Sequence, residues 1–488
     1  MKKIISMLIA VLMLASLIAV PTFASQEFVF PDETWGESEN GEFLIADAAD
    51  LLAFSASAQM NNYYDKKTVK LTADIDMTNI EWLPVVNFKG TFDGDGHAIK
   101  GVTLAGQDGR IGFFTQITNA TIQNVRFLDF NVSMAATSAK TAAIVAAYAN
   151  HACFVKNVYT SGVASTAGTI AAGMIGYVNT QNTGVLKFEN CVSAVKCIGK
   201  RSGGFVGQIH PLTTVEFTDC AFIGDLSEAG QWSSGFTGLT VGVAKLTRCV
   251  SLANVASAKS KEIGSLVFLD HQNNDQAKAA KSEILIEDCY AATADNYYAV
   301  GVCASRGWPF VLTIKNGGET KFYLESSESA TLPNSRDAIE SATNYIAKGA
   351  TVNITKDDFS TKLAVLEGWE ATGTTVEYAE GFTVDVIVPA SVKVLMDKTF
   401  EAAPLGPSTD DNGTTDDGTT DDGTTDDSKA DDKTADDSDT ETEAPKDTQG
   451  ATVETPEKGC SGSMGVSAIA IFALAGGAVA IARKKKED

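Results

Sequence analysis

A short pattern that recurs about every thirty residues constrains the fold of this chain more than any other feature. The pattern is an apolar residue, any residue, a polar residue and then Val or Cys. It occurs in six segments, Ile122–Val125, Val155–Val158, Phe188–Cys191, Phe217–Cys220, Leu246–Cys249 and Ile286–Cys289. A small residue followed by a mostly apolar run repeats with the same period, as at Gly173, Gly204 and Gly235. Two patterns with one period indicate a repeat protein, because each copy must bury its apolar face against the next.

Each copy holds short runs of Val, Ile, Phe and Thr separated by Gly, Asn and Ser, which are strand and turn signals. No copy carries a clear amphipathic helix, which disfavours ankyrin units and helix-bearing leucine-rich units. The sequence therefore predicts an all-β fold, a right-handed parallel β-helix (solenoid) with small helical caps. In that fold two inward files are expected, one of Phe188, Phe217 and Leu246, and one of Cys191, Cys220 and Cys249.

The polar position of the repeat is also in register. It is occupied by Asn124, Asn157, Asn190, Asp219 and Asp288. Asn and Asp tolerate the left-handed bend that turns one strand into the next, and their side chains can bond the adjacent coil. We expect a partial polar ladder interrupted by Arg248. The alternative, a row of ligand-binding carboxylates, is disfavoured because only two of the five residues are Asp.

The two ends of the chain predict export and anchoring. Residues 1–24 read as a signal peptide, with Lys2 and Lys3 before an apolar run and a Thr-x-Ala ending. The alternative is an N-terminal anchor helix. Met464–Ala482 is uncharged and precedes a basic cluster, which predicts one transmembrane helix with a cytoplasmic tail at 483–488. The rest of the chain would lie outside the cell, and the absence of a Leu-Pro-x-Thr-Gly signal makes covalent wall attachment a minor alternative.

Residues 409–463 are expected to form a disordered acidic linker. Within it, residues 410–447 hold 16 acids and 3 Lys, with Asp-Asp pairs every five residues. These pairs lack the Asp-x-Asp-x-Asp-Gly spacing of a calcium loop, so a solvated spacer is favoured. The whole chain has a net charge of −24, which argues against nucleic acid as a partner.

The remaining segments are assigned around the repeats at 111–310. Residues 25–110 are predicted to form an N-terminal cap and the first strands, with Asp47 as N-cap of a helix that carries Leu51 and Phe54. Residues 311–408 are predicted to form the last coil and a C-terminal cap. Helices over 336–347 and from Thr355, and a strand over 381–388, are expected there.

One stretch resembles a known family. Glu81-Trp-Leu-Pro84, the box Phe88-Lys-Gly-Thr-Phe-Asp-Gly-Asp-Gly-His-Ala-Ile99 and the Gly-x-x-Gly and Asn-Cys copies that follow are similar to bacterial GLUG-motif cell-surface proteins. The likeness covers about residues 40–310, and several Gly-x-x-Gly copies lack the second Gly. The resemblance implies an adhesin-like, secreted or anchored scaffold with a parallel β-helix, and it implies no catalytic residues.

Few residues suggest chemistry. Asp93, Asp95 and His97 form a weak acid/base or metal candidate, although a Gly-rich turn whose Asp side chains bond their own backbone is favoured. No metal or cofactor is predicted. Trp232 and Trp308 are candidate sugar platforms, and core or cap positions are equally common for single Trp residues. Among the eight Cys, the stacked residues should be buried thiols, and Cys191 with Cys197 is the best candidate for a disulfide.

Three functions follow from this organisation. The first is a membrane-anchored, non-catalytic adhesin or binding scaffold at the cell surface, with an unidentified extracellular glycan or protein as partner. The second is a polysaccharide lyase or glycosidase, since β-helix enzymes exist, although fold alone is only analogy. The third is a structural spacer with no ligand.

Overall fold

The computed structural model describes most of residues 32–325 and parts of the chain up to Pro404. The described ranges are 32, 34–59, 63–106, 109–135, 141–180, 183–230, 232–253, 263–269, 282–292, 298–302, 310–325, 353–354, 366–377 and 383–404. The predicted signal peptide, acidic linker, membrane span and cytoplasmic tail lie outside these ranges, as do the helices expected over 336–347 and from Thr355. Among the described helices, none is long and apolar enough to cross a membrane.

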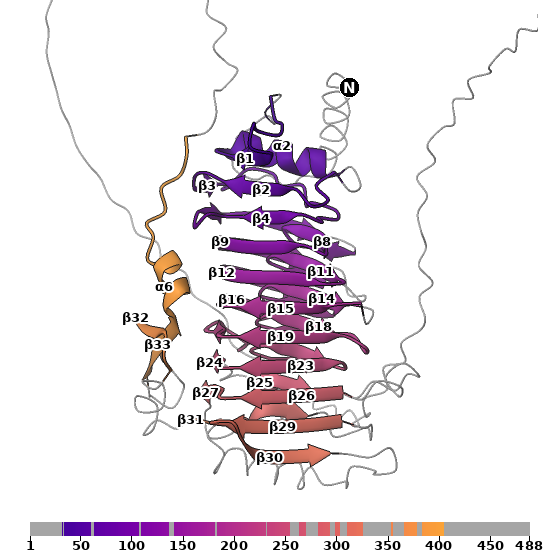
Figure 1. Cartoon of the computed structure of the whole chain (residues 1–488), viewed down its shortest axis with the longest axis vertical. Coiled ribbons are helices and arrows are strands. Elements are labelled where there is room, and N and C mark those ends of the chain that lie inside the picture. Colours follow the sequence, from indigo (N-terminus) through magenta and orange to yellow (C-terminus); the bar gives the residue numbers. More distant parts are fainter. Residues whose placement is uncertain are drawn as a thin grey trace, which may run out of the picture. The chain divides into compact units, whose positions relative to one another are not determined.

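The chain winds into a parallel β-solenoid (Figure 1). Its first face is a stack of parallel strands, each paired with the equivalent strand one turn later. These strands are β1 (Glu42–Ile45), β2 (Thr68–Leu71), β4 (Thr91–Asp93), β9 (Thr121–Met134), β12 (Cys153–Thr166), β15 (Val185–Glu189), β19 (Thr214–Thr218), β23 (Val243–Thr247), β26 (Ser282–Glu287) and β29 (Phe310–Asn316). The parallel β-helix and its repeats are therefore confirmed.

The second face continues from the first and contains the later halves of β9 and β12. Its other strands are β3 (Ile75–Asp76), β5 (Ala98–Lys100), β6 (Thr103–Gly106), β16 (Val192–Ile198), β20 (Ala221–Phe222), β24 (Val250–Ser251), β27 (Tyr290–Ala292) and β31 (Asn353–Ile354). β30 (Glu319–Glu325) pairs antiparallel with β29 at the end of the stack.

The third face is a separate sheet of two adjoining strand columns. One column holds β7 (Arg110–Ile111), β10 (Thr141–Ala143), β13 (Ile170–Ala172), β17 (Arg201–Gly203) and β21 (Ser233–Ser234). The other holds β8 (Phe114–Thr118), β11 (Ala146–Asn150), β14 (Ile175–Asn179), β18 (Val206–Ile209) and β22 (Thr237–Thr240). β25 (Ile263–Leu269) extends both columns, and β28 (Tyr298–Val302) pairs with it.

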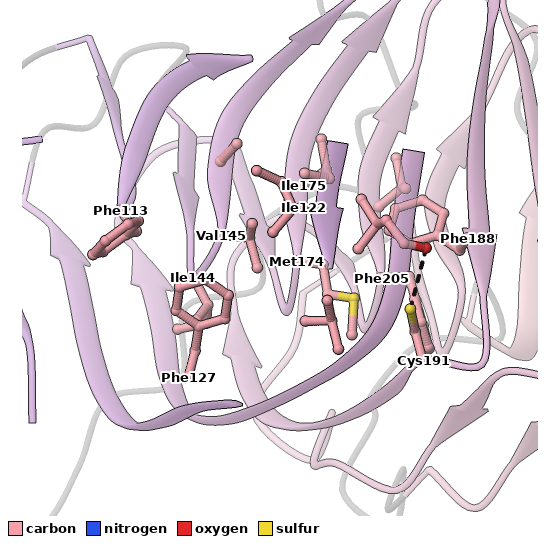
Figure 2. Packing of buried hydrophobic residues seen from close by; sticks show 14 of the residues in the cluster. Phe113, Ile122, Phe127, Ile144, Val145, Met174, Ile175, Phe188, Cys191 and Phe205 are labelled. Carbon is pink, nitrogen blue, oxygen red and sulfur yellow. Dashed lines mark hydrogen bonds between the residues drawn. The ribbon is translucent and has the colours of Figure 1, made fainter. Parts of the chain in front are cut away.

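The inward files predicted from the repeat are present. Phe188 pairs in register with Phe217, and Phe217 with Leu246. The rings of Phe188 and Phe217 stack with centroids 5.0 Å apart and planes 8° apart. Figure 2 shows Phe188 beside other buried side chains of the core, such as Phe205 and Cys191. Equivalent residues of successive turns thus bury one another, which is the packing that a single copy cannot provide.

The polar position of the repeat adopts the predicted left-handed bend. All six residues have positive φ: Asn124, Asn157, Asn190, Asp219, Arg248 and Asp288. Asn157 donates a hydrogen bond to Asn124 (3.0 Å), and Asn124 donates to Asp93 (3.1 Å). Arg248 interrupts the ladder of amides and instead donates to Asp219 (2.7 Å). These residues therefore shape the corner between the first and second faces.

The repeated small residue is explained by close approach between turns. A Cβ on Gly173 would lie 2.0 Å from the carbonyl oxygen of Gly204, and a Cβ on Gly204 would lie 2.2 Å from that of Gly235. No side chain fits at such distances, so successive glycines let the turns stack at strand spacing.

The helix α2 (Ala48–Ala58) lies at the N-terminal end of the solenoid (Figure 1). Asp47 is its N-cap as predicted, and its side chain accepts a hydrogen bond from the backbone of Asp50 (3.0 Å). Phe54 packs edge-on against Phe88 (5.9 Å) and contacts Phe92 (5.8 Å). The helix thereby covers the apolar interior that the first turn would otherwise expose.

The C-terminal part of the fold differs from the expected cap on the last coil. β32 (Trp369–Glu377) and β33 (Thr383–Pro389) form an antiparallel pair that continues into α6 (Ala390–Met396). We call residues 366–377 and 383–404 the strap. Its Val384, Val386, Val388 and Val392 form one buried cluster with Val192, Ala221, Val250 and Leu252 of the second face. The strap therefore lies along the flank of the solenoid (Figure 1).

The end of the strap is held at the first turns by a buried ion pair. Asp74 and Arg126 are 5% and 2% exposed, and the Arg126 guanidinium lies 3.3 Å from the Asp74 carboxylate. That carboxylate also accepts from the backbone of Ala98 (2.7 Å) and Glu401 (3.0 Å), while Arg126 donates to the carbonyl of Lys398 (2.6 Å). These bonds pair both buried charges, although Arg126 Nε has no hydrogen-bond partner among the described residues, and they fix the strap to the second, third and fourth turns.

Six cysteines lie in the described ranges, and all are buried, free thiols: Cys153, Cys191, Cys197, Cys220, Cys249 and Cys289. The disulfide considered for Cys191 and Cys197 is absent. The Cys191 thiol instead donates to the carbonyls of Val155 (3.4 Å) and Glu189 (3.3 Å). Cysteines one turn apart stack in parallel, as small hydrophobes do, so their geometry does not favour a bridge.

We expect these six thiols to resist alkylation in the native protein. All six are buried, which keeps the reagent away from the sulfur atoms. Burial also raises the pKa of the Cys153 thiol to about 11 and raises that of Cys197, so these two form little of the reactive thiolate. Iodoacetamide treatment followed by peptide mapping should leave all six unmodified in native buffer and modify all six in guanidinium without reductant. A disulfide-linked peptide containing Cys191 and Cys197 would contradict this expectation.

Candidate functional site

Asp93, Asp95 and His97 lie close in sequence, at the turn between β4 and β5, but each side chain contacts different partners. Asp93 accepts hydrogen bonds from Gln123 (2.8 Å) and Asn124 (3.1 Å) of the next turn, and from the backbone of Asp95 (2.9 Å). Asp93 therefore bonds the backbone of its own Gly-rich turn and links that turn to the adjacent coil.

The other two residues are directed elsewhere. Asp95 forms an ion pair with Lys70 (3.0 Å), and His97 lies 3.4 Å from the Asp74 carboxylate beneath the strap. Within the described ranges, no group of three or more His, Cys, Asp or Glu side chains is placed to hold a metal ion. Each of the three candidates thus has a structural partner in the first turns.

Trp232 is only 9% exposed, so it is not an open sugar platform. Its ring covers Leu239, Val241 and Phe268 on the third face. Lys200 lies 4.9 Å and Arg201 5.2 Å from the ring centroid, which places cations over its outer side. Trp308 lies outside the described ranges.

A lattice of alternating charges covers the first face between β12 and β23. Lys187, Glu216 and Lys245 occupy equivalent positions of successive turns. Glu216 pairs with Lys187 (3.5 Å) and with Lys245 (3.2 Å), and in the neighbouring file Lys156 pairs with Glu189 (2.8 Å). Opposite charges one strand apart stabilise a sheet, each by a few tenths of a kcal/mol to about 1 kcal/mol.

A surface hollow of about 340 Å³ opens within this lattice. Its lining consists of Phe154, Lys187, Phe188, Glu189, Glu216 and Thr218. Phe154 supplies an apolar, partly exposed surface, whereas both glutamates are held in ion pairs with lysines. The hollow offers hydrogen-bonding groups of both signs beside one aromatic ring, which suits polar ligands such as sugars.

Sequence reasoning missed this lattice, although its signal is visible. Lys187, Glu216 and Lys245 are separated by one repeat length each, and their charges alternate. The inward pattern of the same strands had been identified, so the alternate residues had to face outward and meet across turns. Opposite charges at equivalent positions of successive repeats therefore predict ion pairs between turns, as apolar residues at such positions predict the core.

Comparisons with known proteins assign no family to this chain. No family model matches the chain, and no curated protein matches it. A solved structure that it resembles is titled as a "putative immunoglobulin A1 protease" from Bacteroides ovatus, with 14% sequence identity, a TM-score of 0.40, and coverage of 72% of this chain and 93% of that one.

Proposed function

We propose that this chain is a non-catalytic, adhesin-like surface protein of the GLUG type that binds an extracellular glycan or protein. The observation that supports it is the extended first face, where parallel strands of successive turns present one flat, charge-patterned surface. Such a surface recognises a ligand through many weak contacts and provides no single reactive centre.

The chain ends support the same proposal. A signal peptide at 1–24 would export the chain, the acidic linker at 409–463 would hold the solenoid away from the membrane, and the span at 464–482 would anchor it. The roughly 40 acidic-segment residues, at about 3.3 Å each, could extend beyond about 100 Å and carry the solenoid through a thick wall.

A cell-surface experiment tests this function. Cells displaying the full chain should bind at least one ligand of a glycan array or of a panel of extracellular proteins. Cells displaying a variant that lacks residues 25–408 but keeps the linker and anchor should lose that binding, with equal display measured by an epitope tag in the linker. Unchanged binding by the variant would reject the proposal, and a full chain that binds nothing would favour a structural spacer.

The second candidate, a polysaccharide lyase or glycosidase, is supported by the two glutamates that line the hollow on the first face. Glycosidases use a pair of carboxyl groups that flank the scissile bond. Release of reducing ends or unsaturated products from a panel of polysaccharides, with loss of release in Glu216→Gln and Glu189→Gln, would establish this candidate instead. A charge-matched control is Glu283→Gln, which lies on the same face outside the hollow.

A further inference from the structure

The third face carries a line of cations and aromatic rings. We call Arg110, Tyr148, Tyr177, Lys200 and Arg201 the cation–aromatic stripe. The Arg110 guanidinium lies 4.0 Å from the centroid of the Tyr148 ring, and the rings of Tyr148 and Tyr177 stack 5.5 Å apart with planes 13° apart. Lys200 and Arg201 follow beyond Tyr177, over the ring of Trp232. The stripe thus runs along the axis of the solenoid.

Its spacing comes from the strand register. Arg110 pairs with Thr141, Thr141 with Ile170, and Ile170 with Arg201. The two arginines therefore lie in one file three strand spacings apart, which is roughly 14 Å. In the adjoining file, Tyr148 and Tyr177 are paired in register between them. The arginines and the tyrosines therefore lie in two adjoining files that both run along the axis of the solenoid.

The cations of the stripe differ from those of the first face. Lys156, Lys187 and Lys245 are each paired with a glutamate. In the part of the chain that the structure describes, neither Arg110 nor Lys200 has a carboxylate in an ion pair, and both are exposed. Arg201 donates a hydrogen bond to Gln208 (2.7 Å). In a chain with a net charge of −24, the exposed Arg110 and Lys200 form a local positive surface that complements an anion.

The tyrosines form the base of this surface. Tyr148 is 8% exposed and Tyr177 is half-buried, and burial raises the pKa of both, so their hydroxyls stay protonated. The ring of Tyr148 lies between Arg110 and Tyr177, so it offers no open face for a sugar to cover. Recognition at this surface therefore relies on the charges of the cations.

We propose that the cation–aromatic stripe binds a linear polysaccharide that carries carboxylate groups, such as a polyuronate, laid along the solenoid axis. A linear polymer with repeated carboxylates matches cations that are spaced along the axis of the solenoid. This inference rests on the proposed binding function, and it names the class of ligand and the face that takes it.

The test uses the full chain in detergent and immobilised polygalacturonate, with fully methyl-esterified polygalacturonate as the uncharged counterpart. The full chain should bind the acid form, bind the ester at least about tenfold more weakly, and lose affinity as salt increases. The double variant Arg110→Ala/Lys200→Ala should bind the acid form at least about tenfold more weakly, because two charge-assisted contacts are lost. Both residues are exposed, so folding should be unaffected.

A matched control removes the same charge away from both the hollow and the stripe. Lys321→Ala/Lys393→Ala loses two lysines that are paired with Glu319 and Asp397, and it should bind the acid form within about twofold of the wild type. Equal weakening by both double variants would attribute binding to net charge and overturn the assignment of the stripe. Equal binding of the acid and the ester would overturn the requirement for carboxylates.

The acidic segment at 410–447 is a competing occupant. Binding of polygalacturonate that appears only after deletion of this segment would show that the chain's own acids occupy the stripe, and would overturn the assignment of an external polysaccharide. A full chain that does not bind polygalacturonate but binds another array ligand through residues 25–408 would still be a binding scaffold. Failure of the stripe proposal is therefore distinguishable from failure of the proposed function.

Discussion

The variant Arg126→Met should lose about 3–5 kcal/mol of unfolding free energy, measured by urea denaturation. Arg126 and Asp74 are both buried, so removal of the guanidinium leaves a carboxylate without its cation in the interior. The bond to the Lys398 carbonyl is lost as well. Methionine keeps the apolar part of the side chain, so the loss of stability reflects the missing charge and the missing hydrogen bonds.

Hydrogen exchange should place this loss in the strap. Amides of β33 and α6 should exchange faster in Arg126→Met, whereas amides of β15 and β19 should change little, because solenoid turns contact mainly their neighbours. Lys70→Met is the control, since Lys70 forms an exposed pair with Asp95 and should cost less than about 1 kcal/mol. A loss of that small size in Arg126→Met would show that the buried pair does not hold the strap.

The strap also explains which faces of the solenoid are open to a ligand. Its valines bury Val192, Ala221 and Val250, which are outward residues of the second face. Trp369 adds a hydrogen bond to Asp219 (3.2 Å), and Arg248 donates to the carbonyl of Glu367 (2.9 Å). The part of the second face that carries these residues is therefore an internal interface, whereas the hollow lies on the first face and the stripe on the third.

Much of the solenoid was predictable because its signals are periodic. The files of Phe188, Phe217 and Leu246 and the left-handed bends at Asn124 and Asn157 follow from residues spaced one turn apart. A period in the sequence becomes a neighbour in space when turns stack, so comparison of repeats identifies contacts directly.

The strap and its buried ion pair could not be predicted in this way. Asp74, Arg126 and Lys398 lie far apart in the sequence and belong to no common repeat position. Nothing in the alternating pattern of β33 indicates whether its apolar side covers the end of the last coil or the flank. The choice depends on apolar residues of the second face, such as Val192 and Val250, whose outward direction becomes visible only with the strand register.

The variant Phe217→Ala should lose about 3–5 kcal/mol, because it removes a ring from the centre of the core. Phe217 is 1% exposed, stacks on Phe188, and meets the rings of Phe205 (5.7 Å) and Phe236 (5.3 Å) edge-on. All three partners are themselves buried, so the space left by the ring would be apolar and closed to water. Urea denaturation followed by circular dichroism measures the loss.

A matched control comes from the repeat itself. Leu246 occupies the equivalent position one turn later, so Phe217→Leu places a residue that this file already accommodates, and its cost should be about 1.5 kcal/mol or less. Because each turn contacts only its neighbours, Phe217→Ala should also divide unfolding into separate transitions on the two sides of the altered turn. Equally small losses of unfolding free energy in Phe217→Ala and Phe217→Leu would show that Phe217 does not lie in a packed file. The strand register from which the surfaces above are derived would then be wrong.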